Sequence, residues 1–240
     1  MNKLSLAVLL AVSTLQPLSA TAIGSLAPSV TITVDGQAVD TSGLSFGYDP
    51  ASKSGFIRGA IETPGWELNL DVNTNPDPFV LYAVGVTNFT AGPLAFNFIF
   101  GTPVVLGPYN HVTSSFNGSV TDLRGDGSSL SGATQLALLD AVSVPSVALG
   151  PFVCADGPSA PLTNHACPVG PGFGPVSGFV PSANYVSLAA DLSFTISAND
   201  ASSLNGGVQL DAATQTPEPA TVFLGFLSLA LIPVARRFRR

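Results

Sequence analysis

The sequence is poor in charge, in sulfur and in the side chains that most often carry catalysis. Only 10% of its 240 residues are charged, and it has two cysteines, two histidines and one tryptophan. Globular proteins average about 25% charged residues, and 46% of this chain is hydrophobic, which together exclude an acidic disordered segment. With two histidines, no paired-carboxylate signature and no phosphate-binding loop, we expect no enzyme.

Basic residues are scarcest in the body of the chain. Five of the eight lie within five residues of an end, and between Ile23 and Thr216 only Lys53, Arg58 and Arg124 remain. Against 14 acidic residues, these three give the body a formal charge of −11. This excess excludes nucleic acid and anionic membrane surfaces as partners of the body, and it is compatible with bridging by cations.

The N-terminus has the pattern of a secretory signal peptide. Lys3 precedes an apolar run from Leu4 to Leu15, and Ala20-Thr21-Ala22 follows as a small-residue cleavage site. A run of 12 residues is well below the roughly 20 needed to cross a bilayer. We therefore predict a signal peptide over residues 1–22 and export across the inner membrane.

The C-terminus has the pattern of a short membrane anchor. The 16 residues from Ala220 to Ala235 are mostly apolar and precede a cluster of arginines. As a helix they would span roughly 24 Å, which inserts if the arginines reach the headgroups or the bilayer thins. Arginines beside an apolar span stay cytoplasmic, so a transmembrane helix over 220–235 places the body on the far side of the inner membrane.

The order of motif, apolar span and basic tail over residues 217–240 resembles the PEP-CTERM sorting signal of Gram-negative bacteria, sometimes labelled the ice-binding protein C-terminal domain. The resemblance implies cleavage near Pro219 by an exosortase, and a surface or matrix protein of bacteria that make exopolysaccharide. An unprocessed anchor is the alternative, but it does not require the Pro-Glu-Pro triplet. The sorting residues would be Pro217, Glu218, Pro219, Arg236, Arg237, Arg239 and Arg240.

Between the two ends, the residue pattern favours strands. The chain has 24 glycines and 20 prolines, which leave little room for long helices. Trp66–Asn73 and Tyr185–Ser197 alternate apolar and polar residues, whereas Phe79–Phe89 and Leu94–Phe100 are more continuously apolar. We predict an all-β domain over residues 23–197, an antiparallel β-sandwich of eight to twelve strands with a jelly-roll-like or Greek-key topology.

Four other segments carry weaker patterns. Residues 30–39 predict a hairpin that turns at Asp35-Gly36. Residues 136–144 fit either a helical turn or a strand. The proline-rich stretch 145–181 predicts a long loop. Residues 198–216 predict a spacer between the sandwich and the membrane, which can include a short strand at 208–210.

Two sets of residues predict bonds or ligands. Cys154 and Cys167 predict a disulfide in an exported protein, worth roughly 3 kcal/mol by loop-closure entropy, although His165 could join them in a zinc site that would lack a fourth ligand. Four oxygen donors at alternate positions resemble the start of a calcium-binding EF-hand loop, but a proline and a tyrosine occupy its glycine and glutamate positions. The alternative for these four is a wet strand face and a turn; they are Asp71, Asn73, Asn75 and Asp77.

Three functions remain open from the sequence. The first is a structural surface or matrix protein associated with exopolysaccharide, without a cofactor unless calcium binds. The second is a glycan- or ice-binding module. The third is a surface hydrolase, because Gly43-Leu44-Ser45-Phe46-Gly47 matches a nucleophile elbow that His111 or His165 could complete, although no helix follows it.

Overall fold

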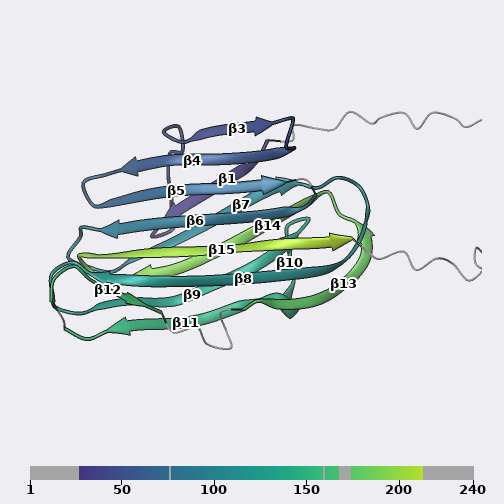
Figure 1. Ribbon diagram of the computed structural model, residues 1–240. Coiled ribbons are helices and arrows are strands. Elements are labelled where there is room, and N and C mark those ends of the chain that lie inside the picture. Colours follow the sequence, from purple (N-terminus) through teal and green to yellow (C-terminus); the bar gives the residue numbers. More distant parts are fainter. Residues whose placement is uncertain (1–26, 76, 159, 168–173, 213–240) are drawn as a thin grey trace, which may run out of the picture.

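The computed structural model describes residues 27–75, 77–158, 160–167 and 174–212, which form two antiparallel sheets packed against each other (Figure 1). The sequence-based prediction of a two-sheet antiparallel sandwich is confirmed. The seven-stranded sheet contains, in order, β10 (Val142–Ser143), β9 (Ser128–Leu139), β14 (Ser187–Ile196), β7 (Leu94–Pro103), β1 (Ser29–Val34) and β2 (Gln37–Ala38), with β11 (Leu149–Asp156) also paired to β9.

The second sheet has eight strands and lies in front in Figure 1. Its order is β12 (Thr163–Ala166), β8 (Pro108–Asp122), β15 (Asp200–Ala212), β6 (Phe79–Asn88), β5 (Trp66–Asn75), β4 (Ser54–Glu62) and β3 (Ser45–Asp49), with β13 (Val176–Asn184) also paired to β8. A single 3-10 turn, η1 (Pro145–Val147), stands between β10 and β11 among the described residues.

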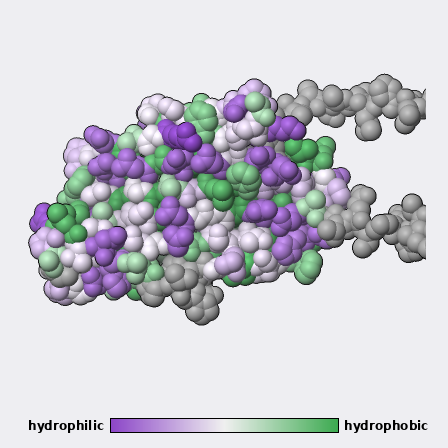
Figure 2. All heavy atoms as spheres, viewed as in Figure 1, coloured by the Kyte–Doolittle hydropathy of each residue, from purple (hydrophilic) through white to green (hydrophobic). Residues whose placement is uncertain are grey.

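Alternating apolar side chains fill the space between the sheets. On β14 every second side chain from Leu188 to Ile196 is at most 3% exposed, as the period of two predicts. Aromatic rings join the sheets: Tyr82 lies 5.1 Å from Phe100 and Trp66 lies 6.0 Å from Phe96, between ring centroids. The outer face of the eight-stranded sheet is polar, with apolar residues scattered over it (Figure 2).

The chain repeatedly passes from one sheet to the other. The predicted hairpin forms within one sheet, where β1 pairs β2 and both turn residues, Asp35 and Gly36, have positive φ. Residues 90–93 instead carry the chain from β6 in one sheet to β7 in the other. The β8–β9 and β14–β15 connections also cross between the sheets, and together they build one end of the sandwich.

Two sequence-based boundaries are wrong. Residues 200–212, predicted as part of a spacer, form β15, which pairs with both β6 and β8 and so lies inside the sheet. The small residues of this strand weaken the alternating pattern in the sequence. Two of them, Gly206 and Gly207, occur where Tyr82 and Leu81 leave no room for a side chain. The predicted loop 145–181 likewise contains η1, β11, β12 and the start of β13. The described residues form 15 strands, more than the eight to twelve expected.

The ambiguous segment 136–144 is entirely strand and turn, because it completes β9 and returns as β10. Within the described part of the chain, no helix is long and apolar enough to cross a membrane. The predicted signal peptide 1–22 and the predicted transmembrane helix 220–235 lie outside the described residues.

Candidate functional site

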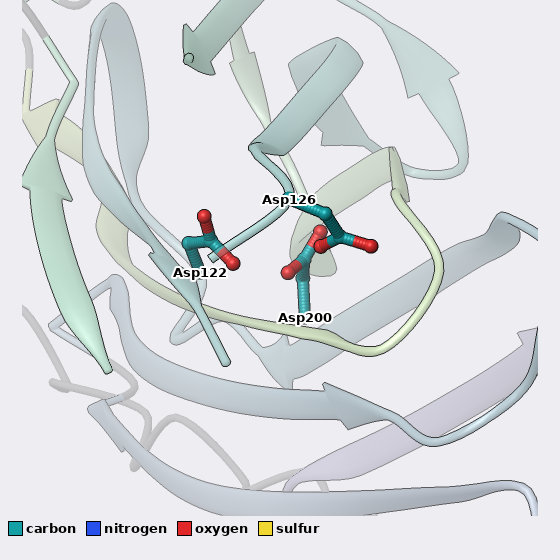
Figure 3. Close-up of side chains that lie close together, drawn as sticks. All are labelled: Asp122, Asp126 and Asp200. Atoms are coloured by element: carbon teal, nitrogen blue, oxygen red, sulfur yellow. The ribbon is translucent and has the colours of Figure 1, made fainter. Parts of the chain in front are cut away.

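Three aspartates meet where the β8–β9 and β14–β15 connections pass between the sheets (Figure 3). Asp122 ends β8, Asp126 lies in the turn that leads to β9, and Asp200 begins β15. One carboxylate oxygen from each lies within 4.8 Å of the others. Asp122 and Asp200 also stand directly opposite each other on paired strands, where two like charges are unfavourable.

Backbone N–H groups of the β8–β9 turn hold the Asp122 carboxylate. Its Oδ1 accepts bonds from the N–H of Arg124 at 3.1 Å and of Gly125 at 2.5 Å, and its Oδ2 accepts one from Gly127 at 2.8 Å. Burial raises the pKa of Asp122, but these N–H groups together outweigh burial and lower it. The turn therefore keeps a fully buried carboxyl group in its charged form.

The pKa of Asp200 is shifted in the opposite direction, upward. Its side chain is completely buried; Oδ2 accepts a hydrogen bond from the Ser197 hydroxyl, whereas Oδ1 has no hydrogen-bond partner in the described structure. Burial is the largest cause that raises its pKa, and the charges of Asp122 and Asp126 add to it. The Ser197 bond and the nearby Leu123 N–H lower the pKa, but they offset this rise only in part.

The Oδ1 oxygen of Asp200 is the unpartnered point of the cluster, since it is buried and accepts no hydrogen bond in the described structure. The ion pairs found there join Arg58 to Asp71 at 3.1 Å and His111 to Asp211 at 3.3 Å. A buried carboxylate oxygen without a partner is costly unless a proton or a cation reaches it. A donor set made only of oxygens suits hard divalent cations rather than zinc or copper.

The calcium ligands predicted from the sequence lie elsewhere, along the outer face and end of β5. Arg58 donates to Asp71 Oδ1 at 3.1 Å and to Asn73 Oδ1 at 3.3 Å, so a guanidinium already binds both oxygens. Asn75 Oδ1 accepts the N–H of Asp77 at 2.9 Å and closes a turn. This geometry favours the alternative, a solvent-exposed strand face followed by a turn. The calcium hypothesis at these residues stays untested.

The two cysteines form the predicted disulfide. Cys154 on β11 and Cys167 just after β12 are bonded, with Cα atoms 5.3 Å apart. Because β11 belongs to the seven-stranded sheet and β12 to the eight-stranded one, the bond ties the two sheets together. Both sulfur atoms are used in the bond, which removes them as zinc ligands beside His165.

The residues of the hydrolase hypothesis are far apart. Ser45 begins β3, an edge strand, whereas His111 lies on β8, five strands away in the same sheet. At about 4.8 Å per strand this separation is on the order of 24 Å. His165, on β12, is one strand further, so neither histidine reaches Ser45.

The predicted sorting residues lie outside the described part of the chain. They are Pro217, Glu218, Pro219, Arg236, Arg237, Arg239 and Arg240. In comparisons with known proteins, no family model matches the chain and no curated protein gives a significant match.

No pattern in the sequence predicts the three-aspartate cluster. Its one local sign is the Asp122-x-x-x-Asp126 spacing in a turn rich in glycine, which by itself indicates only a turn. Asp200 lies more than seventy residues further on, in the stretch predicted as a spacer. Only the pairing of β15 with β8 brings it to the other two.

Proposed function

We propose that the protein is exported, held transiently in the inner membrane by helix 220–235, and then transferred to the cell surface or the extracellular matrix by an exosortase. The sequence patterns at both ends support this route. The observation that carries export is the Cys154–Cys167 bond across the two sheets, because stable disulfides belong to oxidising compartments outside the cytoplasm.

For its role outside the cell, we propose a structural, non-enzymatic component associated with exopolysaccharide. The distance between Ser45 and either histidine supports a non-enzymatic role. The charge of −11 on residues 23–216 suits a soluble surface domain that cations can bridge to acidic polysaccharide. We propose a jelly-roll-like or Greek-key topology as the finer description of its sandwich.

The route is tested by the intact mass of the protein from a host with its exosortase and from the same host without it. We expect a C-terminus near Pro219 only when the exosortase is present. Replacing Glu218 with Ala should block the cut, whereas the matched change Gln215→Ala, outside the triplet, should not. A C-terminus still at Arg240 in the presence of the exosortase would refute the sorting route.

A second candidate function is glycan binding at a groove beside Trp66. The groove encloses about 480 Å³ between the β1–β2 hairpin and the apolar side chains of Ile61, Trp66 and Leu94. A partly exposed indole in such a groove is a surface on which a sugar ring can stack. Trp66 is the only tryptophan, so its emission reports directly on titration with neutral oligosaccharides. Unchanged emission at 10 mM would contradict this function.

A further inference from the structure

The β8–β9 turn and the start of β15 bring three carboxyl groups close together. Asp122 and Asp200 are both fully buried, and Asp126 closes the cluster from the exposed side. The ion pairs Arg58–Asp71 and His111–Asp211 lie elsewhere in the eight-stranded sheet. Two buried carboxyl groups side by side are stabilised when a positive partner from solution, a proton or a cation, lies between them.

The orientation of Asp200 indicates where that partner binds. Its carboxyl group lies between those of Asp122 and Asp126 in Figure 3. Its Oδ1 is buried and accepts no hydrogen bond, although a buried polar atom in a native protein nearly always has a partner. The Ser197 hydroxyl fixes the other oxygen and so prevents the carboxyl group from turning away.

The three oxygens lie close enough together to share one cation. Two oxygens on opposite sides of a calcium ion, each about 2.4 Å away, are about 4.8 Å apart. The three carboxylate oxygens lie within that same span of one another. We propose that Asp122, Asp126 and Asp200 bind one calcium ion at this end of the sandwich.

The ion would bridge the two connections that pass between the sheets at this end of the sandwich. Asp122 and Asp126 bracket the passage from β8 to β9, and Asp200 follows the passage from β14 to β15. The Ser197 hydroxyl oxygen, which holds Asp200, also accepts the N–H of Ser129 at 2.7 Å at the start of β9. Calcium thus stabilises the junction of β8, β9, β14 and β15. Calcium is abundant outside the cell, so that even a site of moderate affinity is occupied there.

The experiment is calcium titration of the full-length protein in mild detergent, after dialysis against a chelator. Isothermal calorimetry should give one site per chain with a Kd of about 10⁻⁴–10⁻³ M, the range of extracellular calcium modules. The midpoint of thermal unfolding should rise by about 5 °C at 5 mM calcium, by mass action on the folded state. Magnesium at the same concentration should raise it less, because that smaller ion demands a tighter octahedron.

Asp200→Asn and Asp126→Asn should each abolish the calcium shift, while the control Asp71→Asn should keep it. Without calcium, Asp200→Asn should unfold at a higher temperature than the wild type, because it removes buried repulsion between like charges. Should Asp200→Asn fail to fold, Asp126→Asn decides alone, since Asp126 is exposed.

Three results would overturn the site. The first is a wild-type protein with no calcium heat and no shift at 5 mM. The second is a response that Asp71→Asn removes and Asp126→Asn keeps, which would place calcium on β5. The third is an equal shift with magnesium, which would reject calcium as the ion.

Discussion

A buried glutamine joins the two sheets through the middle of the core, and its removal should destabilise the whole domain. Gln135 on β9 is completely buried. Its Oε1 accepts the hydroxyl of Tyr82, and its Nε2 donates to Ser114 Oγ at 2.5 Å and to Gly207 O at 3.1 Å, all in the opposite sheet. Burial raises the pKa of Tyr82, so its hydroxyl remains a donor at any ordinary pH.

Gln135→Leu preserves the volume of the side chain but leaves polar groups of Tyr82 and Ser114 without their partner. Each buried group left unsatisfied costs about 1–3 kcal/mol, and the burial of the added apolar surface offsets part of this cost. We expect a net loss of about 2–4 kcal/mol in the free energy of unfolding, or about 5–15 °C in the unfolding midpoint for a domain of this size. The matched control Gln37→Leu, at an exposed position of β2, should change stability by less than about 0.5 kcal/mol.

Urea unfolding followed by Trp66 fluorescence measures this loss, because Trp66 packs on Phe96 of the opposite sheet and reports on their separation. A double-mutant cycle with Tyr82→Phe isolates the hydrogen bond, and we expect a coupling of about 0.5–3 kcal/mol between the two positions. A Gln135→Leu protein as stable as the wild type, or a coupling of zero, would refute the view that this amide holds the sheets together.

Three further predictions concern stability. Reduction of the Cys154–Cys167 bond, verified by alkylation and mass spectrometry, should lower the unfolding free energy by about 3 kcal/mol for its 13-residue separation, and an unchanged midpoint would contradict this. Arg58→Ala should cost less than about 1 kcal/mol in urea unfolding, because its ion pair is half exposed; a loss above about 2 kcal/mol would show that this reasoning is wrong. Asp140→Ala should lower the free energy of unfolding by about 1–2 kcal/mol, because Asp140 Oδ1 accepts the N–H groups of Val186 and Ser187, both at 2.9 Å. An unfolding midpoint equal to that of the wild type would contradict this prediction.

The sequence predicts strands well where large apolar residues alternate with polar ones. Trp66–Asn73 and Tyr185–Ser197 show that period directly, and both segments form strands whose apolar face is buried. β15 has the same period in Ser202, Leu204, Val208 and Leu210, but glycine and serine dilute it. Local propensity then favours a spacer, whereas the tight packing beside Tyr82 requires those glycines.

The candidate site depends on contacts that no local pattern contains. The alternating oxygens of Asp71 and Asn73 form a visible motif, yet Arg58 from the neighbouring strand binds them. Asp200, by contrast, has no motif around it, and its place beside Asp122 follows from the register of β15 against β8. Spacing along the chain can suggest a ligand, but strand pairing decides which carboxylates share a space.

The disulfide and the acidic cluster occupy the same end of the sandwich. β12 pairs with the last residues of β8, where Thr163 stands opposite Asp122, and β11 pairs with the first residues of β9, where Asp156 stands opposite Ser128. The segment closed by the disulfide therefore flanks the β8–β9 turn on both sides, and the Leu162 N–H donates to Asp122 O at 2.6 Å. Because covalent and backbone bonds already hold this turn, the three carboxylates are positioned before any cation arrives, and binding needs little further ordering of the chain.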